Sequence, residues 1–276
     1  MKPAPFEYHA PTTVEEAVEL LARGDGARVL AGGQSLVQLM KFRVDKPSAL
    51  VDINGVRELE TIELRDGELH LGALVRQQTL LEDQLIADCC PLLREAARFV
   101  GYQETRRRGT VAGSLAFAAP WAELTAAAVA LDASLDVRSA SRERTIRIRD
   151  FFRGPHMTEL ERGELIVGIR FPVPGTPRGA AFHEVSVRYR DYAQVAAAAL
   201  VGTDGSAELV MLCVADTPYH VDASAAIENE GALLDLLSAI NPADDIDASA
   251  AYRRRVAPVL AHRALREATA RAEEAA

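Results

Sequence analysis

Residues 31–36 of the chain read Ala31-Gly32-Gly33-Gln34-Ser35-Leu36. Glycine has no Cβ, so the paired glycines let the main chain turn sharply and approach a ligand closely. Successive N–H groups in such a turn can point at phosphate oxygens, and Ser35 adds a hydroxyl donor. The segment has neither the third glycine of the GxGxxG dinucleotide fingerprint nor the GKS or GKT of a P-loop. We therefore predict a loop suited to a diphosphate, with an ordinary glycine turn as the structural alternative.

A second stretch with similar chemistry reads Thr110-Val111-Ala112-Gly113-Ser114. If the two stretches face one cleft, their main-chain donors would hold the two phosphates and the ribityl chain of FAD from opposite sides. FMN has a single phosphate, so two such loops predict FAD as the cofactor rather than FMN. Arg106, Arg107 and Arg108 directly precede the stretch. Runs of charge are usually solvated, so we assign these arginines no role.

The segments around these two stretches predict an α+β fold. Thr13 followed by Glu16 forms a capping box, and apolar residues then repeat at helical spacing as far as Leu21. Asp66-Gly67 is a turn signal between two strand-like runs and predicts a hairpin. The further elements predicted in this part of the chain are strands over 27–30, 49–53, 61–64, 68–74, 135–137, 146–148 and 165–171, and helices over 36–42, 91–100 and 121–131.

A cluster of prolines and glycines between Pro172 and Gly179 predicts a border between two domains. We place an FAD-binding domain at residues 1–175, with subdomains 1–55 and 56–175, and a C-terminal domain at 176–276. Three strands, over 181–187, 195–201 and 207–215, and helices from residue 222 onward predict a three-stranded antiparallel sheet covered by helices.

Composition narrows the class of protein. The 276 residues include 31 basic and 40 acidic side chains, a net charge of −9, which argues against a nucleic-acid partner. Three cysteines without CxxC spacing cannot supply the four thiolates of an iron–sulfur cluster, and six scattered histidines show no ligand spacing, so we predict no metal site. Neither a signal peptide nor an apolar run of membrane-spanning length is apparent, so we expect a cytoplasmic protein.

The two glycine stretches resemble the two FAD-binding signatures of the flavoprotein subunit of molybdenum hydroxylases. That family includes the medium chain of carbon monoxide dehydrogenase and the FAD subunits of xanthine dehydrogenases. The resemblance covers nearly the whole chain. It extends to Val51-Asp52-Ile53, Leu71-Gly72-Ala73, Asp150-Phe151-Phe152, Gly163-Glu164-Leu165-Ile166, Arg190-Asp191-Tyr192-Ala193 and Tyr252-Arg253-Arg254.

The resemblance implies a PCMH-type, vanillyl-alcohol-oxidase-like FAD-binding domain of two α/β subdomains, followed by the small C-terminal domain. It implies that Tyr192 lies near the isoalloxazine ring and screens it, and that Glu123 hydrogen-bonds sugar hydroxyls of the cofactor. FAD should be bound non-covalently, since neither stretch contains cysteine or histidine. The cofactor-binding residues implied in this way are Ala31, Gly32, Gly33, Gln34, Ser35, Leu36, Thr110, Ala112, Gly113, Ser114, Glu123, Ile166 and Tyr192.

The resemblance also implies partners. A large subunit would carry the molybdenum cofactor and hydroxylate the substrate, and a small subunit would carry two [2Fe-2S] clusters, in a dimer of heterotrimers. This chain would pass electrons through FAD to an external acceptor, and because the flavin does the redox chemistry we expect no catalytic residue on the chain itself.

Two positions depart from the family pattern. Gln34 stands where carbon monoxide dehydrogenases have histidine, and Ala119 stands where many members have aspartate, which argues against the carbon monoxide subgroup. Two other functions stay open from the sequence. One is a self-sufficient FAD-dependent reductase or oxidase with the same type of FAD domain. The other is a non-catalytic scaffold whose two glycine stretches are structural turns.

Overall fold

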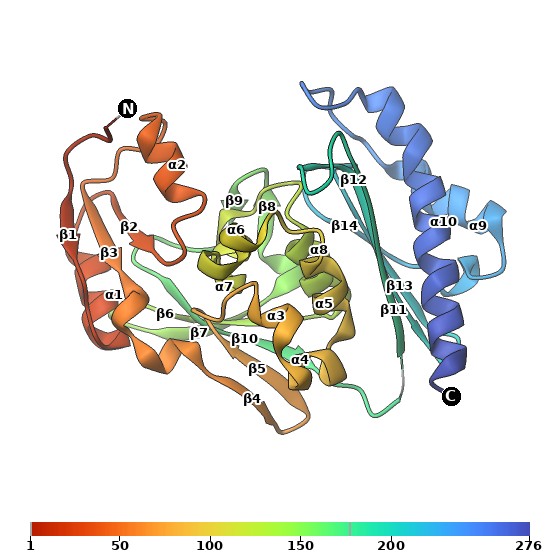
Figure 1. The fold of residues 1–276 in the computed structure, drawn as a ribbon, viewed down its shortest axis with the longest axis horizontal. Coiled ribbons are helices and arrows are strands. Elements are labelled where there is room, and N and C mark those ends of the chain that lie inside the picture. The colour runs from red at the N-terminus through yellow and green to blue at the C-terminus, as the bar shows by residue number, and fades with distance from the viewer. Residues whose placement is uncertain (1, 177) are drawn as a thin grey trace.

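The computed structural model describes residues 2–176 and 178–276, and arranges them as three lobes in a row (Figure 1). The first lobe comprises residues 2–55, the second lobe residues 56–175, and the C-terminal lobe residues 178–276. The second lobe lies between the other two. The predicted border near residue 175 falls in the connection between the last strand of the second lobe and the first strand of the C-terminal lobe.

The first lobe is a small parallel sheet covered by one helix. Its strand order is β1 (Glu7–His9), β3 (Ala49–Asp52) and β2 (Ala27–Leu30). Helix α1 (Val14–Arg23) packs on the sheet, and the hydroxyl of Thr13 accepts from the N–H of Glu16, so the predicted cap is confirmed. The N-terminal arm joins the sheet as β1.

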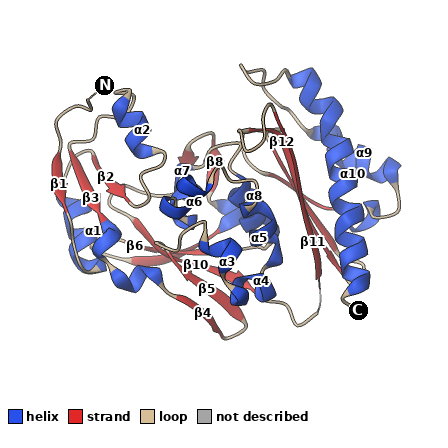
Figure 2. Cartoon of the chain, in the orientation of Figure 1, coloured by secondary structure: helices blue, strands red, loops and turns tan. Residues whose placement is uncertain are grey.

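The second lobe is built on a five-stranded antiparallel sheet with helices on one face (Figure 2). The hairpin expected at Asp66-Gly67 is present, and a second hairpin follows residue 138. The order of the strands is β4 (Ile62–Arg65), β5 (Glu68–Gly72), β10 (Leu165–Pro172), β6 (Ser134–Arg138) and β7 (Glu143–Arg147), and a separate ribbon holds β8 (Phe152–Gly154) and β9 (Met157–Thr158).

Helices in the first two lobes are short. Their bounds are α2 (Leu36–Lys41), α3 (Thr79–Glu82), α4 (Gln84–Cys89), α5 (Pro91–Ala97), α6 (Gln103–Arg108), α7 (Val111–Phe117) and α8 (Glu123–Ala130), with 3-10 turns at Ile53–Gly55, Arg57–Glu60 and Ile148–Asp150.

The C-terminal lobe differs from the prediction in the size of its sheet. The order is β11 (Arg178–Ser186), β12 (Ala193–Gly202), β13 (Ala207–Leu212) and β14 (Tyr219–Asp222), all antiparallel. The predicted three-stranded sheet is therefore wrong by one strand. The fourth strand has only four residues and follows Pro218, so its sequence carries too little alternation to be recognised, and pairing with β13 defines it.

The two faces of this sheet are buried against different partners. Alternate residues such as Phe182, Ala198 and Val210 belong to the same apolar core as the second lobe, where α5 and α8 lie on the sheet. The other face forms a separate core under α10 (Ala250–Glu274) and α9 (Glu230–Leu236), with 3-10 turns at Ser224–Ala226 and Leu237–Ala239. Among the described residues no helix is both long and apolar enough to cross a membrane.

Candidate functional site

The first glycine segment lies where β2 ends, as expected. Gly33 has φ of +70°, a conformation that favours glycine because other residues are strained there. Within the described part of the chain, the N–H groups of Gly33, Gln34 and Ser35 donate to no protein acceptor, whereas the carbonyls of Gly33 and Ser35 begin the turns of α2. The segment therefore offers consecutive free donors next to the first turn of a helix, which is the arrangement that binds anionic oxygens.

The second segment is not a loop throughout, because Val111 to Ser114 form the first turn of α7. Thr110 is its N-cap, and its hydroxyl oxygen accepts from the N–H of Gly113 at 3.0 Å. The N–H of Val111 is also used, by the carbonyl of Val75. The sequence pattern of a capping threonine three residues before Gly113 carried this signal. The second segment consequently offers fewer free main-chain donors than the first.

The structure brings the first segment into direct contact with Arg108 and Gly109, the two residues just before the second segment. A Cβ atom at Gly32 would overlap the carbonyl oxygen of Arg108 and lie 2.7 Å from Cα of Gly109. The lack of a side chain at position 32 is therefore what permits the main chains of the two lobes to touch. The sequence left open whether the two segments face each other, and this contact brings the first segment to the start of the second.

Two residues that the sequence analysis missed link the segments. Arg76 donates from Nη1 to the carbonyl oxygen of Arg108 at 2.6 Å and from Nη2 to Oδ1 of Asn54 at 2.7 Å. Asn54 in turn donates from Nδ2 to the carbonyl oxygen of Ala31 at 2.9 Å. Asn54-Gly55 is a common turn dipeptide and Arg76 belongs to no recognised motif, so only their three-dimensional contacts indicate a role.

The arginine run before the second segment is mixed in character. Arg107 and Arg108 are exposed, as expected of a solvated run. Arg106 is buried, and its guanidinium donates to the carbonyls of Val100 and Gly101, which ties α6 to the end of α5. Arg106 therefore has a structural role.

At the other end of α7, a row of aromatic rings leads to Tyr192. The ring of Phe117 lies 4.6 Å from that of His156, His156 lies 5.7 Å from Trp121, and Trp121 lies 4.9 Å from Tyr192. Tyr192 is 61% exposed and precedes β12. Tyr192 is therefore not a buried strand aromatic, and its ring is held at the surface by Trp121.

Two carboxyl groups lie where the second and C-terminal lobes meet. Glu123 begins α8, and burial raises its pKa to about 7. Glu184, on β11, was not predicted as a site residue. Burial, with a smaller contribution from the charge of Glu123, raises the pKa of Glu184 to about 9, and its Oε2 has no partner among the described residues. Burial also raises the pKa of the nearby Cys213 thiol to about 12.

The surroundings of three further positions bear on the predicted site. Leu36 is half-buried at the start of α2, beside the first segment. Ile166 is only 4% exposed and belongs to the core within β10, so its assignment to the cofactor stays a prediction. Ala119 is also 4% exposed, so an aspartate there would be largely buried.

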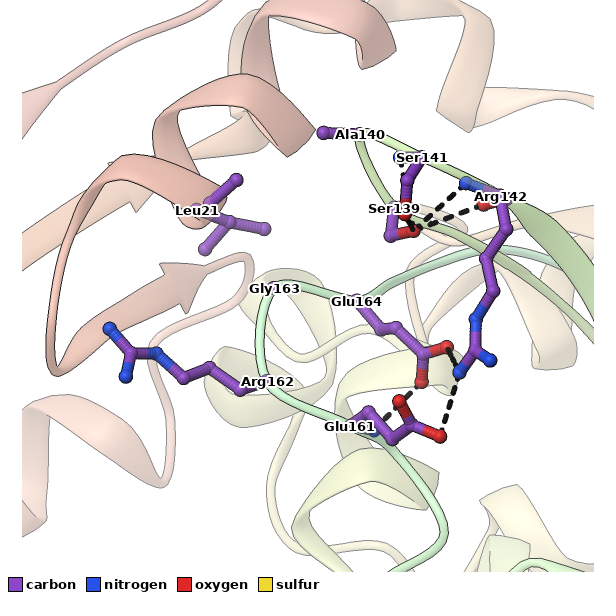
Figure 3. Close-up of a pocket in the computed structure, with 10 residues that line it drawn as sticks. Leu21, Ser139, Ala140, Ser141, Arg142, Glu161, Arg162, Gly163 and Glu164 are labelled. Atoms are coloured by element: carbon purple, nitrogen blue, oxygen red, sulfur yellow. Dashed lines mark hydrogen bonds and ion pairs between the residues drawn. The ribbon is translucent and has the colours of Figure 1, made fainter.

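A cavity of about 400 Å³ lies away from these residues (Figure 3). It is lined by the end of α1, the turn between β6 and β7, and residues 161–164. Burial opposes ionisation of Glu164 there, yet hydrogen bonds, chiefly from Arg144, lower its pKa to about 2. The end of α1 leads directly into the start of β2, so the cavity lies near the opposite end of β2 from Gly32. None of the predicted site residues lines it.

Comparison with known proteins shows the family and the fold of the chain. The profile of the FAD-binding domain in molybdopterin dehydrogenases matches residues 4–174. The chain is 35% identical to subunit alpha of the 6-hydroxypseudooxynicotine dehydrogenase complex of Paenarthrobacter nicotinovorans, over 99% of this chain and 97% of that one. It is 32% identical to the carbon monoxide dehydrogenase medium chain of Afipia carboxidovorans, over 99% and 100% of the two chains. A chain in the crystal structure of quinoline 2-oxidoreductase from Pseudomonas putida 86 superposes with a TM-score of 0.91, at 32% identity and 99% coverage of both chains.

The fold, the paired glycine segments and these relatives define a flavoprotein subunit of an oxidoreductase. The chain belongs to the family of FAD-binding medium subunits of molybdopterin dehydrogenases, together with the carbon monoxide dehydrogenase medium chain and the xanthine dehydrogenase FAD subunits.

Proposed function

We propose that the chain binds FAD non-covalently where the first and second lobes meet at the two glycine segments, and that it carries electrons within a molybdenum hydroxylase complex. The observation that carries the proposal is the contact of Gly32 with Arg108 and Gly109, beside free N–H groups of Gly33 to Ser35. Consecutive free main-chain donors suit a diphosphate, whose oxygens can accept from several of them at once. The residues present therefore fit the cofactor that the family binds.

Different residues along α7 would bind different parts of the cofactor. Ala31 to Ser35 hold the diphosphate from one lobe, and Thr110 to Ser114 hold the adjoining ribityl and ribose groups from the other. Glu123 accepts hydrogen bonds from sugar hydroxyls, and Tyr192 screens the ring system. A seven-residue helix is about 10 Å long. This length separates the glycine segments from the aromatic row at the end of α7, and such a separation suits an elongated cofactor.

When bound, FAD would supply electron transfer from the [2Fe-2S] clusters of a small partner subunit to an external acceptor. Substrate hydroxylation would belong to a large molybdenum-cofactor subunit, in a dimer of heterotrimers working in the cytoplasm. Support comes from relatives that are described as subunits or medium chains of dehydrogenases and that match the chain along nearly its full length. No observation favours the alternatives of a self-sufficient reductase or a scaffold.

Purification from the native host under mild conditions tests this function. We expect a yellow complex in which this chain travels with two other subunits, one large and one small. Acid precipitation should release FAD, not FMN, into the supernatant, since neither glycine segment contains a cysteine or histidine. Isolation of the chain alone and colourless, with no binding of added FAD, would overturn the proposal.

A further inference from the structure

The contact between the two glycine segments joins the main chains of two lobes, and side chains hold it in place. The guanidinium of Arg76 reaches the carbonyl of Arg108 and the side chain of Asn54, and Asn54 reaches the carbonyl of Ala31. One continuous chain of three hydrogen bonds, between 2.6 and 2.9 Å long, therefore runs from one segment to the other.

Both members of this link are themselves fixed. Oδ1 of Asp52 accepts from Nδ2 of Asn54 at 2.6 Å and from its N–H at 3.0 Å, and Oδ2 of Asp52 accepts from the hydroxyl of Tyr8 at 2.6 Å. Arg76 is half-buried and forms a β-bridge with Thr110, the capping residue of α7. The link thus connects the end of β3 to the start of α7 through groups whose positions are already set.

We propose that Arg76 and Asn54 are positioning residues that fix the spacing between residues 31–35 and 108–114, and that this spacing sets the affinity for FAD. The inference rests on the proposed function, because it concerns the same cofactor site. An arginine suits the task because its planar guanidinium directs donors to two separate acceptors, whereas a lysine ammonium is a single point charge at the end of a flexible stem.

The structure also provides a matched control. Arg162 joins the same two lobes by donating to the carbonyl of Gly24 at 3.1 Å and pairing with Asp25 at 2.9 Å. Its side chain is 65% exposed, and it contacts neither glycine segment. Exposed pairs of this kind contribute little, so Arg162 is an arginine between lobes without the positioning role.

The experiment measures the Kd of FAD for the full chain after removal and readdition of the cofactor. The variants are Arg76→Gln, Arg76→Lys, Asn54→Ser and Arg162→Gln, each checked by circular dichroism and by the melting temperature of the cofactor-free form. We expect Arg76→Gln and Asn54→Ser to raise Kd between 10-fold and 100-fold, about 1.4–2.8 kcal/mol at 1.4 kcal/mol per factor of ten. Arg162→Gln should leave Kd within about twofold.

Two comparisons distinguish positioning from simple attraction of a phosphate by positive charge. The Asn54→Ser, Arg76→Gln double variant should bind FAD no more weakly than the weaker single variant, because both changes break one link. Arg76→Lys should lose most of the affinity although the charge is kept. Full affinity in Arg76→Lys, or additive losses in the double variant, would overturn the inference.

The outcomes also separate this inference from the function on which it rests. If the unaltered chain binds no FAD, the proposed function fails. If the unaltered chain binds FAD and both Arg76→Gln and Asn54→Ser bind it equally well, the function stands and the positioning role is refuted. Should one variant not fold, the other carries the test alone, since each removes the link at a different member.

Discussion

The second lobe shares one apolar core with both of its neighbours, but its junction with the first lobe also has a seam of polar groups. At the loop seam, where residues 31–35 meet residues 108–114, contact is made by main-chain atoms and by the hydrogen bonds of Arg76 and Asn54. At the sheet seam, where α5 and α8 pack on β11 to β13, contact is mainly apolar and continuous with the main core. A seam of polar groups with free donors is suited to receive a ligand, whereas a close-packed apolar seam fixes the lobes that frame it.

A buried charge should lower the stability of the protein more at the sheet seam than at the loop seam. Ala198 is fully buried on the face of β12 that belongs to the main core. Ala198→Asp would bury a carboxylate with no partner, and we expect a loss of about 3–5 kcal/mol in the free energy of unfolding. Thermal or urea unfolding measures it. Thr203→Asp, in the exposed turn after β12, is the control. Equal melting temperatures for the two variants would show that the sheet seam is not packed as described.

The loop seam should be more sensitive than the sheet seam to an added methyl group. Gly32→Ala would place Cβ against the main chain of residues 108 and 109, which cannot yield as a flexible side chain does. We expect at least a 100-fold rise in the Kd of FAD, measured by titration, with a smaller loss of stability than Ala198→Asp. Gly175→Ala is the control, because its Cβ would meet nothing within 4 Å. Unchanged affinity in Gly32→Ala would mean that the segments do not bind the cofactor together.

Tyr192 lies at the edge of the sheet seam but is exposed, so its replacement tests a residue that is not part of the close packing there. Tyr192→Ala should keep FAD bound, because the diphosphate contacts are elsewhere, and should cost only about 1 kcal/mol through the lost contact with Trp121. If the ring screens the flavin, stopped-flow experiments should show faster reoxidation by oxygen of the reduced variant. Trp121 is the only tryptophan in the chain, so its fluorescence reports directly on the loss of the neighbouring ring. Unaltered reoxidation would refute the screening role.

The pH dependence of stability tests the sheet seam in another way. Glu184 has a pKa raised from 4.5 to about 9 by burial. Between those values the folded chain keeps a proton on Glu184 that the unfolded chain releases. The contribution of Glu184 to the free energy of unfolding is therefore full below pH 4.5 and falls as pH rises towards 9, by at most about 1.4 kcal/mol per pH unit. Glu184→Gln, which stays neutral, should flatten this decline in the cofactor-free chain. Parallel melting curves for both proteins from pH 6 to 9 would contradict the buried, protonated state.

Much of the fold could be predicted because its signals are local. The capping box at Thr13 and the turn signal at Asp66-Gly67 each act within a few residues, and both elements formed where expected. The fourth strand of the C-terminal sheet was missed because β14 is short and is defined by pairing with β13. The sequence predicts a loop at the second glycine segment, whereas Thr110 caps a helix there, because small residues favour turns and helix starts alike.

The sequence by itself determined which segments could hold a cofactor, since residues without side chains and consecutive N–H donors are properties of the local chain. Only the tertiary structure decided that Gly32 touches Arg108, that Arg76 and Asn54 link the two segments, and that Tyr192 is exposed beside Trp121. It also decided that Glu184 is buried near a second carboxyl group. The physical reason is distance along the chain: Arg76 is 32 residues from Arg108 and 22 from Asn54, and no local pattern encodes which distant residues will meet once the lobes pack.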